Sequence, residues 1–255
     1  MKEIWKRHSS HVTLGKCIIM AAVCLCLMLG QAQARDLKIS LPFIPPLVET
    51  KDKGILVDLC KALAEEYKGG KITWDVFPFP RSMDNVEKGR ADLHMPYITP
   101  PNPQRIPFQY STEVIFKVIM CLYTNKSNTE INPKNAAKFK IETDAGATYV
   151  FDHDVPGITG SPSIESSLQK LNMGRIDGWL FAMPESDMVL KKLQLKNIKR
   201  WEFKKYDVKA LLPLGEKGKE VDKIFSDLVK KLKASGKYQQ IMAPILDQKF
   251  DPWQP

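Results

Sequence analysis

The chain has 255 residues and a formal net charge of +9, with 44% hydrophobic and 26% charged residues. This length is sufficient to bury the core of one large or two small domains. The lysines are dispersed along the chain rather than clustered with aromatic residues, so we expect no nucleic-acid binding and assign most of the positive charge to solvated helix faces.

The first 34 residues have the architecture of a secretory signal peptide. A basic start precedes the uncharged apolar run Ile18–Leu29 and a small-residue end that contains Ala32 and Ala34. The run is too short for a bilayer-spanning helix of roughly 20 residues, although a retained anchor is the alternative. Cleavage after about Ala34 would remove four basic residues and Glu3, leaving 221 residues with a net charge of +6. We therefore expect a soluble exported protein that starts near Arg35; the periplasmic location comes only from the resemblance described below.

Two of the five cysteines, Cys60 and Cys121, lie outside the signal peptide. Each falls among apolar positions, so we expect small buried hydrophobic side chains rather than a disulfide bond, which an oxidising compartment would permit. His94 and His153 are solitary, and no Cys/His cluster has the spacing of metal ligands. The sequence therefore predicts no metal site and no cofactor.

Strand and helix patterns alternate in the first part of the mature chain. We expect strands at Leu37–Leu41, Lys71–Phe77 and Ala91–Tyr97, and helices at Ile55–Tyr67 and Ser82–Lys88, the latter with Ser82 as its N-cap. Prolines follow the first two strands and crowd the segment after the third, where they remove hydrogen-bond donors. Two strand-helix-strand units in a row predict parallel strands and an α/β layer.

The same alternation continues to the end of the chain. We expect strands at Val114–Tyr123, Phe139–Thr143, Ile176–Phe181, Ile198–Phe203 and Val208–Leu214. The expected helices are Ser163–Asn172, Pro184–Lys192, Gly218–Ser235 and Tyr238–Leu246.

Four short motifs carry a family resemblance. They are Gly54–Leu59 at the opening of the first helix, Val86–Asp92, the parallel segment Leu171–Asp177, and Ser235–Tyr238 followed by Ile241. In this order and spacing, the mature chain resembles the family 3 extracellular solute-binding proteins, the periplasmic receptors of amino-acid-type ABC importers.

The resemblance implies an α/β, two-lobed periplasmic-binding-protein type II (Venus-flytrap) fold with two crossover strands. Lobe 1 would be discontinuous, from residues 35–111 plus 208–255, and lobe 2 would comprise residues 112–207. Such a monomer would close on a small anionic or zwitterionic solute, an amino acid or related carboxylate, and present it to an ABC transporter permease in the inner membrane.

In the family, an Arg three positions after a Thr binds the α-carboxylate of the ligand. Here Thr99 is present, but Arg105 follows six positions later with three prolines between them. The resemblance therefore makes Arg105 the candidate carboxylate clamp, either shifted by a residue or carried on a reshaped loop. A surface arginine without a ligand contact is the alternative. Arg81, at the start of the predicted Ser82 helix, is a second candidate cation.

The resemblance also assigns residues in the second lobe. Gly146, Ala147 and Thr148 match a loop whose free backbone N–H groups accept a carboxylate. Ala182 occupies the position of the usual Asp that pairs with the α-ammonium group. An ammonium group would then need another partner, either Glu185 or Asp187, because an unpaired buried charge costs several kcal/mol.

Four aromatic residues lie at predicted strand ends, where they could stack on a ligand or form part of the core: Phe43, Phe79, Tyr97 and Trp179. Asp92 and Asp177, in the two parallel motifs, are interpreted as structural residues that hold turns.

Two alternatives to a transport receptor remain open. The family includes periplasmic dehydratases that act on cyclic prephenate-like acids, and such an enzyme would need a general acid, for which Glu185 or His94 are candidates. A receptor that feeds a signalling protein is the other. No pair of residues demands catalysis, so the sequence predicts a binding protein without catalytic residues.

Overall fold

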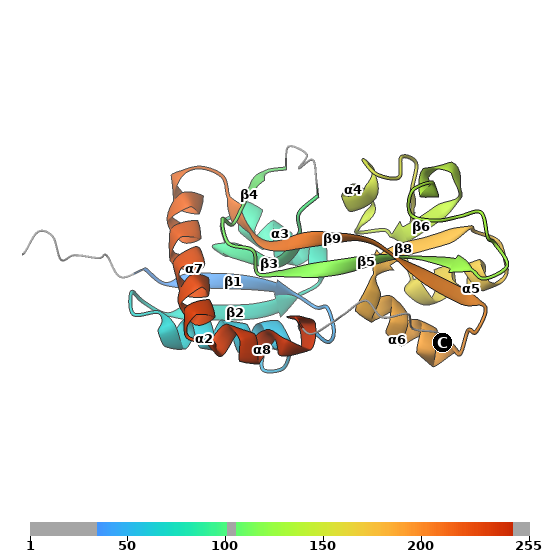
Figure 1. The fold of residues 1–255 in the computed structure, drawn as a ribbon. Coiled ribbons are helices and arrows are strands. Elements are labelled where there is room, and N and C mark those ends of the chain that lie inside the picture. Colours follow the sequence, from blue (N-terminus) through green and yellow to red (C-terminus); the bar gives the residue numbers. More distant parts are fainter. Residues whose placement is uncertain (1–34, 101–105, 247–255) are drawn as a thin grey trace, which may run out of the picture.

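The computed structural model describes residues 35–100 and 106–246. Within these residues, nine strands form one mixed sheet in the order β2-β1-β3-β9-β5-β8-β6-β7, with β4 paired to β9. Two groups of helices and strands lie at opposite ends of this sheet, and the long strands β5 and β9 run between them (Figure 1). The predicted two-lobed α/β architecture is confirmed.

The first lobe is built on parallel strands. Its strands are β1 (Leu37–Pro42), β2 (Ile72–Phe77), β3 (Leu93–Ile98) and the short β4 (Phe108–Tyr110), and its helices are α2 (Ile55–Glu66), α3 (Phe79–Glu87), α7 (Glu216–Ala234) and α8 (Lys237–Leu246). β1 lies between β2 and β3 and is parallel to both. In Figure 1, α2 and α8 lie below these strands and α7 runs across them.

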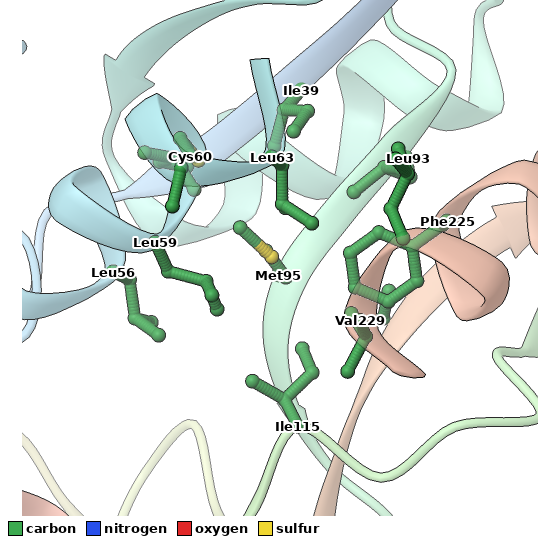
Figure 2. Packing of buried hydrophobic residues seen from close by; sticks show 14 of the residues in the cluster. Ile39, Leu56, Leu59, Cys60, Leu63, Leu93, Met95, Ile115, Phe225 and Val229 are labelled. Carbon is green, nitrogen blue, oxygen red and sulfur yellow. The ribbon is translucent and has the colours of Figure 1, made fainter. Parts of the chain in front are cut away.

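Apolar side chains from these helices and strands meet in one core. Figure 2 shows Cys60 of α2, Met95 of β3 and Phe225 of α7 in the same cluster. Cys60 and Cys121 are both buried free thiols. The expectation of unbridged cysteines that pack as small hydrophobic residues is confirmed.

The second lobe repeats the parallel arrangement on a smaller scale. It contains β6 (Ile141–Asp144), β7 (Thr159–Ser161), β8 (Gly178–Ala182), the 3-10 turn η1 (Ala136–Lys138), α4 (Thr148–Phe151), α5 (Ile164–Asn172) and α6 (Met183–Leu193). β6 is parallel to β7 and to β8. α5 begins one residue later than expected, because Ser163 is its N-cap: Ser163 Oγ accepts a hydrogen bond from the backbone N–H of Ser166 at 3.2 Å.

The two lobes are joined by antiparallel strands that belong to both. β5 (Phe116–Asn125) and β9 (Ile198–Pro213) pair from Phe116 opposite Val208 to Asn125 opposite Ile198. The prediction of two separate strands for β9 was wrong, because the polar stretch 204–207 continues the ladder instead of breaking it. One large core cluster lies mainly in lobe 1, and two smaller clusters lie mainly in lobe 2. The exact residue boundaries of the lobes stay a prediction.

The two Gly-Arg-x-Asp motifs make the same backbone clamp in each lobe. The Asp92 carboxylate accepts a hydrogen bond from the N–H of Lys38 at 2.9 Å, and the Asp92 N–H donates to the Lys38 carbonyl at 2.8 Å. Asp177 exchanges the equivalent pair of bonds with Lys140, at 2.8 and 3.0 Å. Both aspartates therefore fix the entry of a neighbouring strand, as the sequence predicts.

Ser82 is not the N-cap of its helix. α3 begins earlier, at Phe79, with Pro78 as N-cap and Pro80 in the first turn, where its fixed φ favours a helix start. Ser82 lies inside the helix and is buried, and its hydroxyl donates to Ser40 Oγ at 2.9 Å. Among the described helices, none has the length and apolar composition needed to cross a membrane.

Candidate functional site

A cavity of about 500 Å³ lies between the two lobes. Its lobe 1 wall is made by Phe43, Ile44, Leu47, Phe79, Pro80, Pro96 and Ile98. The crossover strands contribute Phe116, Val118 and Val208, and lobe 2 contributes Asp144, Gly146, Ala147, Tyr149, Ile164, Phe181, Ala182 and Glu185. The volume is typical of small-molecule sites, which span roughly 300–1,000 Å³.

The topology explains why these residues meet. Phe43 and Phe79 follow the carboxyl ends of β1 and β2, and Asp144 and Ala182 are the last residues of β6 and β8. Ligands of open α/β sheets bind outside the carboxyl ends of parallel strands. The crossover strands bring these ends from the two lobes face to face.

Six of the predicted site residues line the cavity: Phe43, Phe79, Gly146, Ala147, Ala182 and Glu185. Asp144, Tyr149 and Phe181 line it as well, although the sequence analysis did not select them. Asp144 and Phe181 could have been found from the strand-end rule, since they end or nearly end β6 and β8. The charged side chains of the described lining, Asp144 and Glu185, are both acidic.

Glu185 is the third residue of α6 and has an incompletely bonded carboxyl group. Its own backbone N–H donates to the carboxyl group, whereas Oε2 is buried and has no hydrogen-bond partner among the described residues. Burial raises the pKa of this carboxyl group above its usual range, because the charged form loses its hydration.

The expected anion loop is already occupied by a carboxylate of the protein. The backbone N–H of Gly146 donates to Asp144 Oδ1 at 2.8 Å, and the N–H of Ala147 donates to the Asp144 carbonyl at 2.9 Å. Thr148, the first residue of the four-residue helix α4, does not line the cavity. The expectation that the backbone N–H groups of Gly146 and Ala147 are free to bind a ligand carboxylate was therefore wrong.

An aromatic pair connects the lobes beside the cavity. The rings of Tyr97 on β3 and Tyr149 on α4 are stacked, with centroids 5.2 Å apart and an interplanar angle of 17°. Burial raises the pKa of both phenols. Tyr97 itself is buried beside Phe79 and does not line the cavity. Its neighbours Phe79 and Tyr149 do line it.

Trp179 and Asp187 belong to the lobe 2 core. Trp179 is the second residue of β8, at the end far from the cavity; its side chain is fully buried and its Nε1–H donates to Ser186 Oγ at 3.0 Å. Asp187 lies 2.9 Å from Arg200 Nη1 and accepts a hydrogen bond from the Tyr123 hydroxyl at 2.7 Å. The prediction that Trp179 forms an aromatic wall of the site is wrong. The Asp187 carboxylate contacts Arg200 and Tyr123 inside lobe 2.

Of the two cations predicted for lobe 1, the structure describes only Arg81, which is not found at the cavity. Arg81 is exposed and does not line it. Thr99 donates its backbone N–H to the Asp207 carbonyl at 2.8 Å, and its buried Oγ1 has no hydrogen-bond partner in the part of the chain that the structure describes. Arg105 lies outside the described residues, so its role as the clamp stays a prediction.

His94 lies one layer behind the cavity wall and is not an accessible acid. It is fully buried, its Nδ1 is 2.7 Å from Ser82 Oγ, and its ring contacts the Phe79 ring edge-on at 5.2 Å between centroids. Burial lowers the pKa of His94 from 6.5 to about 3. The imidazole is therefore neutral at pH 7, and His94 lines no part of the cavity.

We expect His94 to make folding stability pH-dependent. The unfolded chain binds a proton on this side chain below about pH 6.5, and the folded chain does so only near pH 3, so the free energy of unfolding falls as the pH falls between these values. Urea denaturation should show that the wild type loses about 1 kcal/mol more than His94→Gln between pH 6 and pH 5. Equal losses in the two proteins would contradict a buried neutral imidazole.

A family profile decides the identity of the fold. The profile of the bacterial extracellular solute-binding proteins, family 3, matches residues 41–248. The chain belongs to this family. No curated protein matches its sequence.

Solved structures of solute-binding proteins and sensors share this fold. A substrate-binding protein of an ABC uptake transporter from Streptococcus pneumoniae with bound histidine aligns with a TM-score of 0.64 at 19% identity, covering 84% of this chain and 93% of the other. A histidine kinase sensor domain with similarity to periplasmic binding proteins aligns with a TM-score of 0.64 at 16% identity, covering 88% and 100%. The ancestral amino acid-binding protein AncCDT-1, a precursor of cyclohexadienyl dehydratase, aligns with a TM-score of 0.61 at 16% identity, covering 82% and 94%.

Proposed function

We propose that this protein is a periplasmic receptor that closes its two lobes on a small organic solute and presents it to an ABC importer in the inner membrane. The observation that carries the proposal is the cavity of about 500 Å³ at the carboxyl ends of strands from both lobes, which two crossover strands connect. A ligand that touches both walls favours the closed form by its differential affinity for that form. Export with cleavage after about Ala34 and a monomeric state are part of the same proposal.

The described lining gives no support to the anionic or zwitterionic solute expected from the sequence. A carboxylate that is moved from water into an apolar wall needs a donor or a counter-charge. The described lining supplies Asp144 and Glu185 and no basic side chain. The proposal is therefore limited to a small organic solute, and the ligand class is argued separately below.

A thermal-shift screen on ligand-free protein tests the receptor proposal. The protein is unfolded in guanidinium chloride, dialysed, refolded, and mixed with amino acids, carboxylates, amines and polyamines. A ligand at 100 times its Kd should raise the Tm by roughly 5–10 °C, because binding to the folded state adds about 2.7 kcal/mol. Small-angle scattering should then show a smaller radius of gyration with that ligand. A folded, ligand-free protein that no solute stabilises would contradict the proposal.

The dehydratase alternative is tested by incubation with prephenate or arogenate. Glu185 is a carboxyl group with a raised pKa at the cavity wall, which is the kind of group that general acid catalysis needs. Binding without product formation supports the receptor, whereas turnover that Glu185→Gln abolishes would replace the proposed function with an enzyme.

A further inference from the structure

We propose that the solute is an organic cation: an amine that carries an aromatic or other bulky apolar group and no carboxylate, with its nitrogen bonded to Glu185. This inference rests on the proposed receptor function, and it is an alternative to the carboxylate clamp that the sequence predicts at Arg105. It concerns the head group and the orientation of the ligand, which four features of the cavity define.

The first feature is the uneven polarity of the two walls. Lobe 1 contributes apolar side chains, including Phe43, Phe79 and Ile98, whereas the two charged groups, Asp144 and Glu185, both come from lobe 2. A ligand carboxylate against the lobe 1 wall would lose its hydration without gaining a donor from the described residues. An apolar group fits that wall, so the charged end of the ligand faces lobe 2.

The second feature is the sign of the charge at lobe 2. Asp144 Oδ1 accepts the backbone N–H of Gly146 at 2.8 Å, so the loop amide that a ligand anion could use is occupied. A ligand carboxylate at this place would approach the like charge of Asp144, which raises its free energy. A ligand cation would instead be attracted to this carboxylate.

The third feature is the unsatisfied oxygen of Glu185. Buried polar atoms are almost always hydrogen-bonded, and Oε2 of Glu185 is buried with no partner among the described residues. An ammonium N–H from the ligand would satisfy this oxygen with a charge-assisted hydrogen bond. It would also favour the ionised carboxylate, which burial by itself disfavours.

The fourth feature is the aromatic content of the wall around these groups. Phe79 comes from lobe 1, and Tyr149 and Phe181 come from lobe 2, so rings from both lobes border the same space. Aromatic faces stack on an apolar ring and attract a cation through their quadrupole. These rings therefore suit both parts of an aryl-alkyl amine.

Three matched compounds test the inference by calorimetry on the refolded, ligand-free protein. They are 2-phenylethylamine, 3-phenylpropanoate and phenylalanine, which share a phenyl-alkyl body and carry an amine, a carboxylate or both. We expect 2-phenylethylamine to bind and 3-phenylpropanoate not to bind. Phenylalanine should bind more weakly than the amine, because its carboxylate must be buried without a donor.

A pair of isosteric variants locates the head group. Glu185→Gln should weaken 2-phenylethylamine binding by about 30-fold or more, because the buried ion pair is lost. Glu165→Gln is the matched control, since Glu165 is also in the first turn of a lobe 2 helix but does not line the cavity. This control should leave the affinity within about 2-fold of the wild type.

The outcomes separate this inference from the receptor proposal. Tighter binding of 3-phenylpropanoate or phenylalanine than of the amine would overturn the inference and leave the receptor standing. An affinity for 2-phenylethylamine that Glu185→Gln does not change would also overturn it. If none of the three compounds binds, the inference is overturned, and the broader thermal-shift screen decides separately whether the protein is a receptor.

Discussion

Replacing Asp187 with Asn is expected to lower the free energy of unfolding by about 3 kcal/mol. Asp187 and Arg200 form a pair at 2.9 Å, and their side chains are only 16% and 3% exposed. The substitution keeps the size of the side chain but removes the carboxylate next to a buried guanidinium group. The loss can be measured by urea denaturation followed by circular dichroism.

An exposed pair provides the control for this prediction. Lys51 and Asp75 lie 2.6 Å apart, but both side chains are 61% exposed. Solvent screens such pairs, so Asp75→Asn should change the stability by less than about 1 kcal/mol. Asp187→Asn should also retain wild-type ligand affinity, because Asp187 does not line the cavity. Lost affinity at unchanged stability would instead make Asp187 the ammonium partner considered from the sequence.

Most of the fold could be predicted because its signals are local. The apolar stripe of α7, the glycine after α3 and the N-cap Ser163 of α5 each act within one or two helical turns. β9 could not be predicted as one strand, since its polar stretch 204–207 is held by pairing with β5 from another part of the chain. Periodicity does not report this long-range pairing.

The site could be predicted in part, for a geometric reason. Phe43 and Phe79 were selected because they follow strands, and the carboxyl ends of parallel strands face the cleft. Ala182 was selected from the family resemblance, and it is the last residue of β8. Trp179 was selected by the same argument applied to the wrong end of β8. The contact between Tyr97 and Tyr149 depends on how the lobes are placed, which neither segment encodes alone.

The occupied loop at Gly146 shows a second limit of the sequence. The resemblance identifies a loop with backbone donors, but it does not show that Asp144, two residues earlier, turns back to accept one of them. A strand-end aspartate close to a glycine is a signal for such a turn, because Asp side chains commonly bond to the backbone N–H two residues on. That signal would have predicted that the Gly146 N–H is already bonded within the protein.

Trp179→Ala is expected to lower the free energy of unfolding by about 3–5 kcal/mol while the remaining folded protein binds its solute as the wild type does. The Trp179 ring is fully buried in a lobe 2 core cluster that also contains Leu168, and its indole N–H is bonded to Ser186. The substitution removes a large packed side chain and its hydrogen bond. Denaturation with urea measures the first effect, and titration with a ligand from the thermal-shift screen measures the second.

Phe43→Ala should show the opposite pattern. Phe43 lines the cavity and is 57% exposed, so little buried area is lost and the stability should change by less than about 1 kcal/mol. The affinity should fall, because a ring that faces the solute is removed. The affinities of the two variants are compared per mole of folded protein. If Trp179→Ala lowers that affinity as much as Phe43→Ala does, Trp179 acts in the site. If the two variants separate as expected, β8 carries a core residue at its amino end and ligand contacts at its carboxyl end.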